Sequence, residues 1–200
     1  MSFFYQSKKH LTKLPLHKVA SAKACCASIA SAYVQSGMII GLGTGSTTNY
    51  FIEYLGLRIA KEGLNIQATT TSLESENLAK QWKIPLIKEN SFSKLDLSVD
   101  GADEIDPQRN MIKGGGGALF KEKIIAECSD LYIIIVEERK CVSQLGAFKL
   151  PVELSPFGYQ ASLKRVSEIG FTPFLRIDKN NKPFISQQGN YIADLQVKKP

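Results

Sequence analysis

The chain contains 200 residues, of which 44% are hydrophobic, so it is long enough for one well-buried domain with a small additional lobe. Its formal net charge is +6, but four lysines (Lys8, Lys9, Lys13 and Lys18) lie in the first 18 residues, where no acidic residue occurs. The rest of the chain carries only +2, which argues against a nucleic-acid-binding face. No apolar run approaches the ~18 residues of a membrane span, so neither nucleic acid nor a membrane is an expected partner.

The basic residues 1–18 lack the apolar centre of a secretory signal, and without Arg they resemble a mitochondrial transit peptide only weakly. We interpret them as an N-terminal extension and expect a cytoplasmic protein. Cys25, Cys26, Cys128 and Cys141 show no C-x-x-C spacing, and the chain has only two histidines, so a zinc site is poorly supplied. Most of these cysteines lie in apolar or helical stretches, where we expect reduced core thiols.

In chain order, the spacing of apolar residues predicts a first helix over residues 17–35, and a short apolar strand follows at residues 38–42. A glycine-rich turn then leads into a second helix, "TTNYFIEYLGLRIA". The unbroken apolar run "LYIIIV" predicts a fully buried strand at residues 131–136. Between these elements we expect strands at residues 66–70, 85–87 and 95–99, a helix over residues 74–82, a loop over residues 100–116 and a helix from that loop to about residue 127.

This alternation of strands and helices predicts an α/β fold: an open, mostly parallel, Rossmann-like sheet with helices on both faces. From about Pro151 the pattern changes to an amphipathic helix, "ASLKRVSEIG", and short antiparallel strands at residues 174–177, 184–186 and 191–195. We therefore predict an extension (residues 1–18), a Rossmann-like catalytic domain (residues 19–150) and a small α+β lobe (residues 151–200).

The sequence "GLGTGSTT" at residues 41–48 places glycines between a predicted strand and a helix. Such glycines let backbone N–H groups approach an anion, and the positive end of the helix adds to the attraction. A dinucleotide-binding motif or an ordinary tight turn is the alternative. However, Ser46 stands where the dinucleotide motif has its third glycine, and no acid directly follows the strand that ends near Thr70. The hydroxyls of Thr44, Ser46 and Thr47 suit a terminal phosphate monoester better.

The sequence "SVDGADEID" gathers four carboxylates, Asp100, Asp103, Glu104 and Asp106, at the end of a predicted strand. Ligands of open α/β sheets bind outside the carboxyl ends of the strands, which is where Asp100 falls. A Mg²⁺-binding loop or a solvated turn would also account for such a cluster. A positive partner for these carboxylates lies in the same loop.

Lys113 is that positive partner, and four consecutive glycines, residues 114–117, follow it directly. Glycines permit close approach of backbone N–H groups to a bound oxygen, so with the lysine they suggest an oxyanion site. Glu122 comes nine residues after Lys113 in the helix that follows. On its own, a helical Glu is more often a solvated residue than a catalytic one.

Together, "GLGTGSTT", "VDGADEID", "MIKGGGGALFKEKII" and "LPVEL" resemble, in order and spacing, the type A ribose-5-phosphate isomerase family. The resemblance spans roughly residues 19–196. It implies interconversion of D-ribose 5-phosphate and D-ribulose 5-phosphate, a step of the pentose phosphate pathway. It also implies that no metal or organic cofactor takes part and that the protein is a homodimer or homotetramer.

The resemblance also assigns expected roles. Glu122 is implied as the catalytic base, Lys113 as the active-site lysine, and Asp100 and Asp103 as sugar-binding aspartates, one of which assists ring opening. Glu104 and Asp106 are then expected to be solvated loop residues or salt-bridge partners. The remaining implied substrate-binding residues are Lys23, Thr44, Gly45, Ser46, Thr47, Gly114, Gly115, Gly116 and Lys140.

Two alternatives remain at this point: a sugar-phosphate-sensing domain without catalysis, and acyl or CoA transfer by a glutamate nucleophile. The sensor would need the phosphate loop but not Lys113 and Glu122, whereas the transferase would need a larger cleft. The resemblance further implies some tens of residues beyond the position of Pro200, including a strand that returns to the main sheet. Without that strand, an edge of the sheet is expected to be unpaired.

Overall fold

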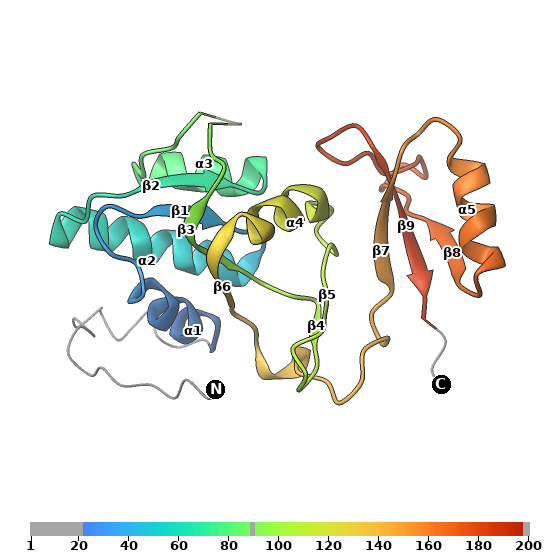
Figure 1. Cartoon of the computed structure of the whole chain (residues 1–200), viewed down its shortest axis with the longest axis horizontal. Coiled ribbons are helices and arrows are strands. Elements are labelled where there is room, and N and C mark those ends of the chain that lie inside the picture. Colours follow the sequence, from blue (N-terminus) through green and yellow to red (C-terminus); the bar gives the residue numbers. More distant parts are fainter. Residues whose placement is uncertain (1–21, 89–90, 198–200) are drawn as a thin grey trace.

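The computed structural model describes residues 22–88 and 91–197 (Figure 1). A parallel four-stranded sheet in the order β2-β1-β3-β6 forms its centre. This arrangement confirms the predicted α/β class. The strands are β1 (Ile39–Leu42), β2 (Gln67–Thr70), β3 (Leu95–Asp100) and β6 (Ser129–Ile134).

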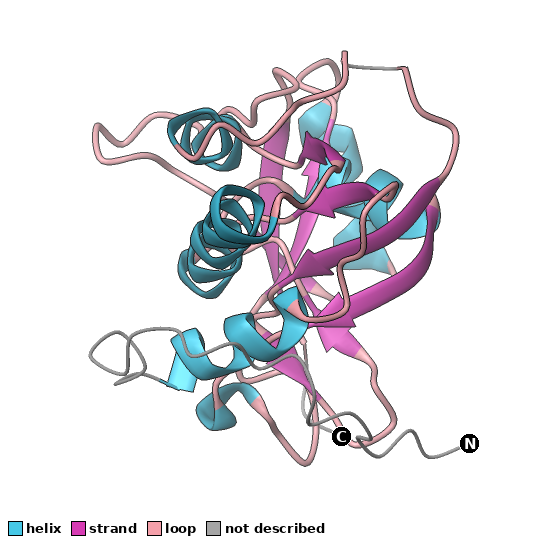
Figure 2. Cartoon of the chain, turned by 90° about the vertical axis from the view of Figure 1, so that its left-hand side faces the viewer, coloured by secondary structure: helices cyan, strands magenta, loops and turns pink. Residues whose placement is uncertain are grey.

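Helices cover both faces of this sheet (Figure 2). α1 (Ala22–Ser31), α2 (Ser46–Glu62) and α3 (Leu73–Gln81) contribute to the main core, and α4 (Leu119–Glu127) contacts β3 and β6. Phe51, Ile52 and Leu55 of α2 are completely buried, which is the spacing that places apolar side chains on one face of a helix. The apolar stripe of α2 thus fixes the helix that follows the glycine-rich turn against the sheet.

α1 packs against α2 through small side chains. Ala24, Ala27 and Ala30 are at most 2% exposed, so the two helices can lie close together. Arg58 of α2 donates to the carbonyl oxygen of Ser31 and, at 3.0 Å, to that of Val34, and so satisfies carbonyls at the end of α1. The helix ends earlier than the predicted residue 35, and the predicted residues 17–21 lie outside the described ranges.

The prediction of core thiols holds only in part: none of the four cysteines is fully buried, and of them only Cys26 packs against the core. Cys25 and Cys141 are exposed, and Cys26 and Cys128 are only partly buried. On α1 the buried positions belong to alanines, so the adjacent cysteines cannot both face the core. All four cysteines are free thiols.

The prediction of a fully buried strand at residues 131–136 is also wrong. In the part of the chain that the structure describes, β6 pairs only with β3 and so forms an edge of the sheet. Leu131 is 44% exposed, and only Ile135, just beyond the strand, is fully buried within the predicted run. An unbroken apolar run therefore did not distinguish an edge strand from a central one.

The C-terminal part of the chain forms a small antiparallel sheet in the order β7-β9-β8, with α5 (Tyr159–Glu168) against β8. The strands are β7 (Leu150–Leu154), β8 (Thr172–Leu175) and β9 (Tyr191–Gln196). The predicted strands at residues 85–87 and 184–186 contain only isolated bridges, of Leu86 to Ala68 and of Ile185 to Tyr191. The predicted division at residue 150 stays a prediction, and residues 1–18 lie outside the described ranges.

Between the two sheets, a short antiparallel hairpin of β4 (Glu104–Ile105) and β5 (Met111–Ile112) occupies most of the predicted loop (Figure 1). The N–H of Asp103 donates to the carbonyl of Ile112 at 2.8 Å, so the chain returns to where it left β3. This return places Lys113, the residue after β5, beside the end of β3. A 3₁₀ turn, η2 (Glu138–Lys140), follows β6 on the same side.

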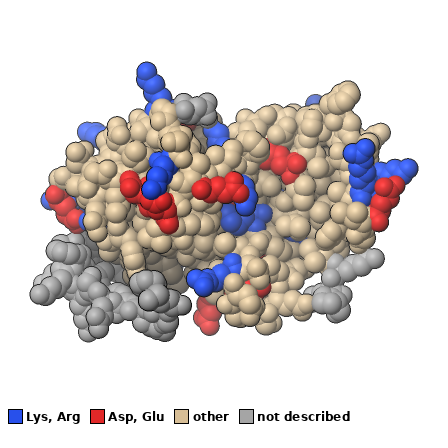
Figure 3. Space-filling model, in the orientation of Figure 1, with Lys and Arg blue, Asp and Glu red and all other residues tan. Residues whose placement is uncertain are grey.

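On the side of the molecule that Figure 3 shows, acidic and basic side chains are interspersed. No helix within residues 22–88 and 91–197 is long and apolar enough to cross a membrane.

Candidate active site

A cleft lies at the carboxyl ends of β1 and β3. The loop after β1, the loop after β3, the glycine loop (residues 114–117) and α4 all contribute to its walls. This is where open parallel sheets place their ligands. The lining residues are Thr44, Gly45, Ser46, Thr47, Thr48, Gly101, Ala102, Asp103, Lys113, Gly114, Gly115, Gly116, Glu122 and Lys140.

One wall is the loop at residues 43–47, between β1 and α2, which the sequence predicts to bind phosphate and which we call the phosphate loop. A Cβ at Gly43 would lie 2.3 Å from the carboxyl carbon of Asp100, so only glycine lets the loop cross the end of β3 this closely. Gly45 is the N-cap of α2. Because glycine has no side chain, the first N–H groups of the helix have no side-chain cap. Those N–H groups and the hydroxyls of Ser46 and Thr47 face the cleft as a concentrated set of donors.

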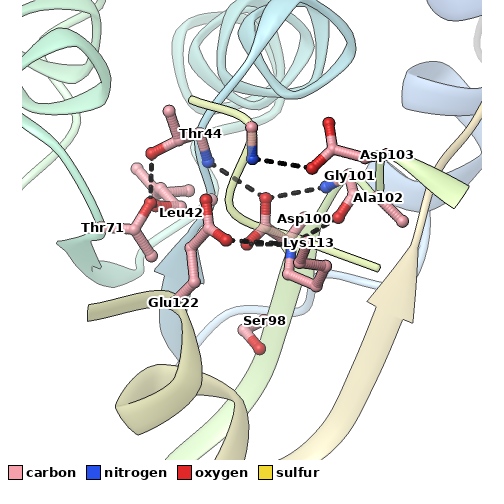
Figure 4. A network of polar contacts seen from close by, with 12 residues as sticks. Leu42, Thr44, Thr71, Ser98, Asp100, Gly101, Ala102, Asp103, Lys113 and Glu122 are labelled. Carbon is pink, nitrogen blue, oxygen red and sulfur yellow. Dashed lines mark hydrogen bonds and ion pairs between the residues drawn. The ribbon is translucent and has the colours of Figure 1, made fainter. Parts of the chain in front are cut away.

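Hydroxyl groups on the segment after β2 support this loop from behind. Thr71 Oγ1 lies 2.6 Å from Thr44 Oγ1 and donates to the carbonyl of Leu42 at 3.2 Å (Figure 4). Ser75 Oγ donates to the carbonyl of Gly43 at 2.5 Å. The run "TTSLES" offered a sequence signal for this support, because it places hydroxyls at the carboxyl end of a predicted strand, but its role was missed.

Lys23 of α1 reaches the same loop. Its Nζ donates to Ser46 Oγ at 2.9 Å and lies 3.0 Å from Glu137 Oε1. The hydrogen bond from Lys23, with the Arg139 and Lys23 charges, lowers the pKa of Glu137. A cation therefore stands beside the phosphate loop, and a carboxylate on the chain after β6 holds it there.

Directly beside the phosphate loop lies a buried cluster of Asp100, Lys113 and Glu122 (Figure 4). Lys113 Nζ lies 3.1 Å from Asp100 Oδ2 and 3.3 Å from Glu122 Oε2, and it also donates to the carbonyl of Gly101. Asp100 is 2% exposed and Glu122 is 5% exposed. Asp100 ends β3, Lys113 follows β5 and Glu122 is in the first turn of α4, so three separate elements meet here.

Burial and charge together determine how these groups titrate. Burial, reinforced by the Asp100 charge and opposed by Lys113, raises the pKa of Glu122 to about 7. Burial also raises the pKa of Asp100, although Lys113 and the N–H groups of Gly101 and Thr44 act against the rise. Burial alone would lower the pKa of Lys113, but Asp100 and Glu122 outweigh it and raise that pKa. The cluster thus combines a fixed cation with a carboxyl that can take up a proton near neutral pH.

Asp103 lies next to this cluster and holds the glycine loop. Its Oδ2 accepts the N–H of Gly115 at 2.7 Å, and a Cβ at Gly115 would lie 2.6 Å from its Oδ1. Lys140, from η2, donates to the carbonyl of Ala102 at 2.7 Å and places a further positive charge on the wall of the cleft. Asp100 itself lies behind the lining residues, where its Oδ1 accepts the N–H groups of Thr44 and Gly101 at 3.1 and 2.7 Å.

The other two carboxylates of the acidic stretch, Glu104 and Asp106, also have structural contacts, but only Glu104 is buried. Glu104 was expected to be solvated or salt-bridged, but it is 4% exposed and accepts the N–H groups of Gly146 and Phe148 at 2.7 and 2.6 Å. Asp106 accepts the N–H and the side-chain amide of Asn110 and so closes the β4–β5 turn. The amino-acid composition of the stretch does not show which of its carboxylates contact backbone groups away from the cleft and which lie at the cleft, as Asp100 and Asp103 do.

No group of three or more His, Cys, Asp or Glu side chains in the described ranges is arranged to hold a metal ion. The acidic side chains at the cleft are instead bonded to Lys113 and to backbone N–H groups.

These features define an α/β protein of the open parallel-sheet class, with a polar cleft lined by a glycine-rich loop and a buried carboxylate–lysine cluster. Residues 67–200 match the family model for ribose 5-phosphate isomerase A (phosphoriboisomerase A). A ribose-5-phosphate isomerase A of Chlamydia felis (strain Fe/C-56) is 49% identical over 168 residues, 84% of this chain and 72% of that protein. The chain belongs to the ribose 5-phosphate isomerase A family.

Solved structures agree with this assignment. The ribose 5-phosphate isomerase A of Methanocaldococcus jannaschii superposes with a TM-score of 0.85 at 38% identity, covering 88% of this chain and 79% of that one. A D-ribose-5-phosphate isomerase in complex with phospho-erythronic acid gives a TM-score of 0.85 at 36% identity, covering 90% and 80% of the two chains.

Proposed function

We propose that this chain is an aldose–ketose isomerase that interconverts D-ribose 5-phosphate and D-ribulose 5-phosphate. The observation that carries the proposal is the contact of Lys113 with Glu122 in a cleft whose other wall is the phosphate loop. Membership of the ribose 5-phosphate isomerase A family supports the same reaction. A small phosphorylated sugar is therefore the substrate, and the reaction belongs to the pentose phosphate pathway.

The phosphate group of the substrate binds at residues 43–47. The N–H groups at the start of α2 and the hydroxyls of Ser46 and Thr47 donate to its oxygens, and Lys23 beside Ser46 balances its charge. This places the phosphorylated end of the sugar against α2. The carbonyl end then extends toward Lys113 and the glycine loop.

Glu122 is the base. Starting from the aldose, its carboxylate removes the proton from C2, the C–H electron pair forms the C1–C2 double bond, and the carbonyl electrons move to O1. In the resulting cis-enediolate the hydroxyl proton passes from O2 to O1, and the same carboxyl returns its proton to C1 as the C2 carbonyl forms. A carboxyl with a pKa of about 7 suits both the removal and the return of a proton at neutral pH. Burial of Glu122 supplies this pKa, so the environment and the chemistry agree.

Negative charge that develops on the sugar oxygens is stabilised by Lys113 and by N–H groups of the glycine loop, with Lys140 on the same wall. Asp103 lies at the cleft and binds sugar hydroxyls. Asp100 lies behind Lys113, where it holds the lysine cation and the N–H of Thr44, and one of the two aspartates carries the proton of the ring oxygen during ring opening.

Three further properties complete the proposal. The reaction uses no metal or organic cofactor, since proton transfer and charge stabilisation are both supplied by side chains. The four free thiols support a reducing compartment such as the cytoplasm. Exposed apolar side chains on the C-terminal part of the chain, among them Phe157, Ile169 and Phe174, support assembly into a homodimer or homotetramer.

A sensor domain without catalysis is not favoured, because phosphate recognition does not require two carboxylates to be buried around Lys113. Acyl or CoA transfer is not favoured either, because the relatives are ribose-5-phosphate isomerases.

The test is an assay of purified protein with ribose 5-phosphate before and after EDTA treatment. We expect activity that survives chelation and a kcat that falls roughly 10²- to 10⁴-fold in Glu122→Gln, with inorganic phosphate still bound. Glu127→Gln is the matched control, because Glu127 is on the same helix but pairs with Lys123 at the surface. Near-native turnover in Glu122→Gln would refute the base assignment, and an inactive wild-type enzyme would refute the function.

A further inference from the structure

We propose that Arg176 is a positioning residue for this isomerisation: held by Asp194, it orients the glycine loop so that the N–H of Gly116 points into the cleft. The inference rests on the proposed function and deepens it. It assigns a role in the active site to the C-terminal antiparallel sheet, which contributes no lining residue to the cleft.

Arg176 is fixed at both its backbone and its side chain. It directly follows β8, its N–H donates to the carbonyl of Ile192 at 2.8 Å, and its carbonyl accepts the N–H of Phe184 at 2.8 Å. Its Nε donates to Asp194 Oδ2 at 2.9 Å while its Nη2 donates to Asp194 Oδ1. The side chains of this bidentate pair are only 15% and 20% exposed, so the guanidinium has one well-defined orientation.

The remaining guanidinium nitrogen reaches the glycine loop. Arg176 Nη1 donates to the carbonyl oxygens of Gly114 and Gly115, at 3.2 Å in each case. The carbonyl of Gly114 and the N–H of Gly115 belong to one peptide unit, and that N–H donates to Asp103 Oδ2 at 2.7 Å. This peptide unit is therefore held from opposite sides, by a residue after β3 and by a residue after β8.

The direction of the next peptide unit follows from this contact. In a planar trans peptide the C=O and the N–H point in opposite directions. Arg176 holds the carbonyl of Gly115 on the side of the C-terminal sheet, so the N–H of Gly116 points the other way, toward the cleft that Gly116 lines. Within the described residues, this N–H has no hydrogen-bond acceptor, which leaves it available to an oxygen of the substrate.

A glycine run needs such external contacts more than other segments do. Glycine has access to more backbone conformations than any other residue, so four in succession do not define the direction of an N–H by themselves. An N–H group that already points at the developing negative charge need not reorient during the reaction. Such preoriented donors are what stabilise an oxyanion. Asp194 also neutralises Arg176, so the pair acts on orientation and adds little net charge to the cleft.

The first experiment compares steady-state kinetics with ribose 5-phosphate for the wild type, Arg176→Ala, Arg176→Lys and Asp194→Asn. We expect Arg176→Ala to lower kcat roughly 100-fold, because a displaced donor loses its alignment, with KM changed by less than about threefold. Arg176→Lys should have a kcat between those of Arg176→Ala and the wild type, because an ammonium does not reproduce the planar set of donors of a guanidinium. Guanidinium ion added to Arg176→Ala should restore part of kcat. Arg165→Ala, on exposed α5, is the matched control and should match the wild type.

The second experiment measures binding by calorimetry. 4-Phospho-erythronic acid carries a carboxylate with the charge and planarity of the enediolate, whereas inorganic phosphate occupies only the phosphate loop. We expect Arg176→Ala and Asp194→Asn to weaken binding of phospho-erythronic acid at least tenfold, about 1.4 kcal/mol, and to leave phosphate binding unchanged. A structural defect alone would weaken both ligands and would not respond to guanidinium.

The proposal is overturned if folded Arg176→Ala keeps the wild-type kcat and the wild-type affinity for phospho-erythronic acid. Should Arg176→Ala fail to fold, Arg176→Lys and Asp194→Asn decide instead, and wild-type values in both would overturn it. Failure of the proposed function is a separate result, because it would appear as an inactive wild-type enzyme.

Discussion

Glu122 Oε2 lies 3.3 Å from Lys113 Nζ, and both groups are largely removed from solvent. Asp100 contacts the same ammonium at 3.1 Å, so one cation stands between two buried carboxyls. A single lysine cannot fully stabilise two negative charges in a buried site. The carboxyl that accepts fewer backbone N–H groups is therefore the one that is more easily protonated. Asp100 accepts two N–H groups, and Glu122 is therefore the group that exchanges a proton near neutral pH.

We predict that kcat/KM falls about tenfold for each pH unit below about 7, because only ionised Glu122 can accept a proton and its pKa is raised to about 7. The measurement is a pH–rate profile of the wild-type enzyme from about pH 5 to pH 9. A flat profile across this range would contradict the assignment of Glu122. Residual activity in Glu122→Gln should lack this acid limb.

The same ionisation should affect stability. Between the unfolded pKa of 4.5 and the folded value of about 7, the folded chain holds a proton on Glu122 that the unfolded chain has released. The contribution of Glu122 to stability is therefore complete below about pH 4.5 and is lost as the pH rises to about 7. Urea denaturation at pH 5 and pH 8 should show Glu122→Gln gaining stability relative to the wild type at the higher pH.

Gly43→Ala should destabilise the protein by roughly 1–3 kcal/mol, since the added Cβ would meet the Asp100 carboxyl carbon at 2.3 Å in a packed site. It should also reduce phosphate binding, because the loop must move away from β3. Gly101→Ala is a suitable stability control: its added Cβ would meet only the carbonyl of Ile135, at 3.8 Å. Equal unfolding midpoints for the two variants would show that the loop is not constrained as described.

Glu104→Ala should destabilise the protein by roughly 1–3 kcal/mol, because the N–H groups of Gly146 and Phe148 would lose a buried charged acceptor. Thermal or urea denaturation measures the change, and Glu138→Ala, at an exposed position of η2, is the control. A Glu104→Ala protein as stable as the control would mean that water replaces the carboxylate at no cost.

The central sheet and its helices could be predicted from the sequence because their apolar periods are local. α2, β1 and β3 follow directly from such patterns. The exposure of Leu131 could not be predicted, because an apolar run does not reveal which strand lies at an edge. The alanines of α1 are a similar case, since the need for small side chains is set by the neighbouring helix and not by α1 itself.

Within the candidate site, the residues next to glycine-rich or acidic motifs could be predicted, and the structure brings Lys113, Glu122 and residues 43–47 to one cleft. Their catalytic and binding roles stay predictions. Arg176 and Asp194 carried no local signal, because Arg176 is 62 residues away in sequence from the Gly114 carbonyl that it contacts. Glu104 was assigned wrongly because its partners, near residues 146–148, come together with it only through the tertiary fold.

The contact of Arg176 with the carbonyls of Gly114 and Gly115 also constrains how this chain could be recombined with its relatives. A chimera that exchanges everything after β7 transplants one side of that contact while retaining the other. Unless the relative that supplies the C-terminal part has an arginine and an acidic partner at the equivalent positions, the hybrid could fold its C-terminal sheet correctly and still leave the peptide units of the glycine loop in the wrong orientation. Crossover points for such hybrids are therefore better placed where no hydrogen bond links the exchanged halves.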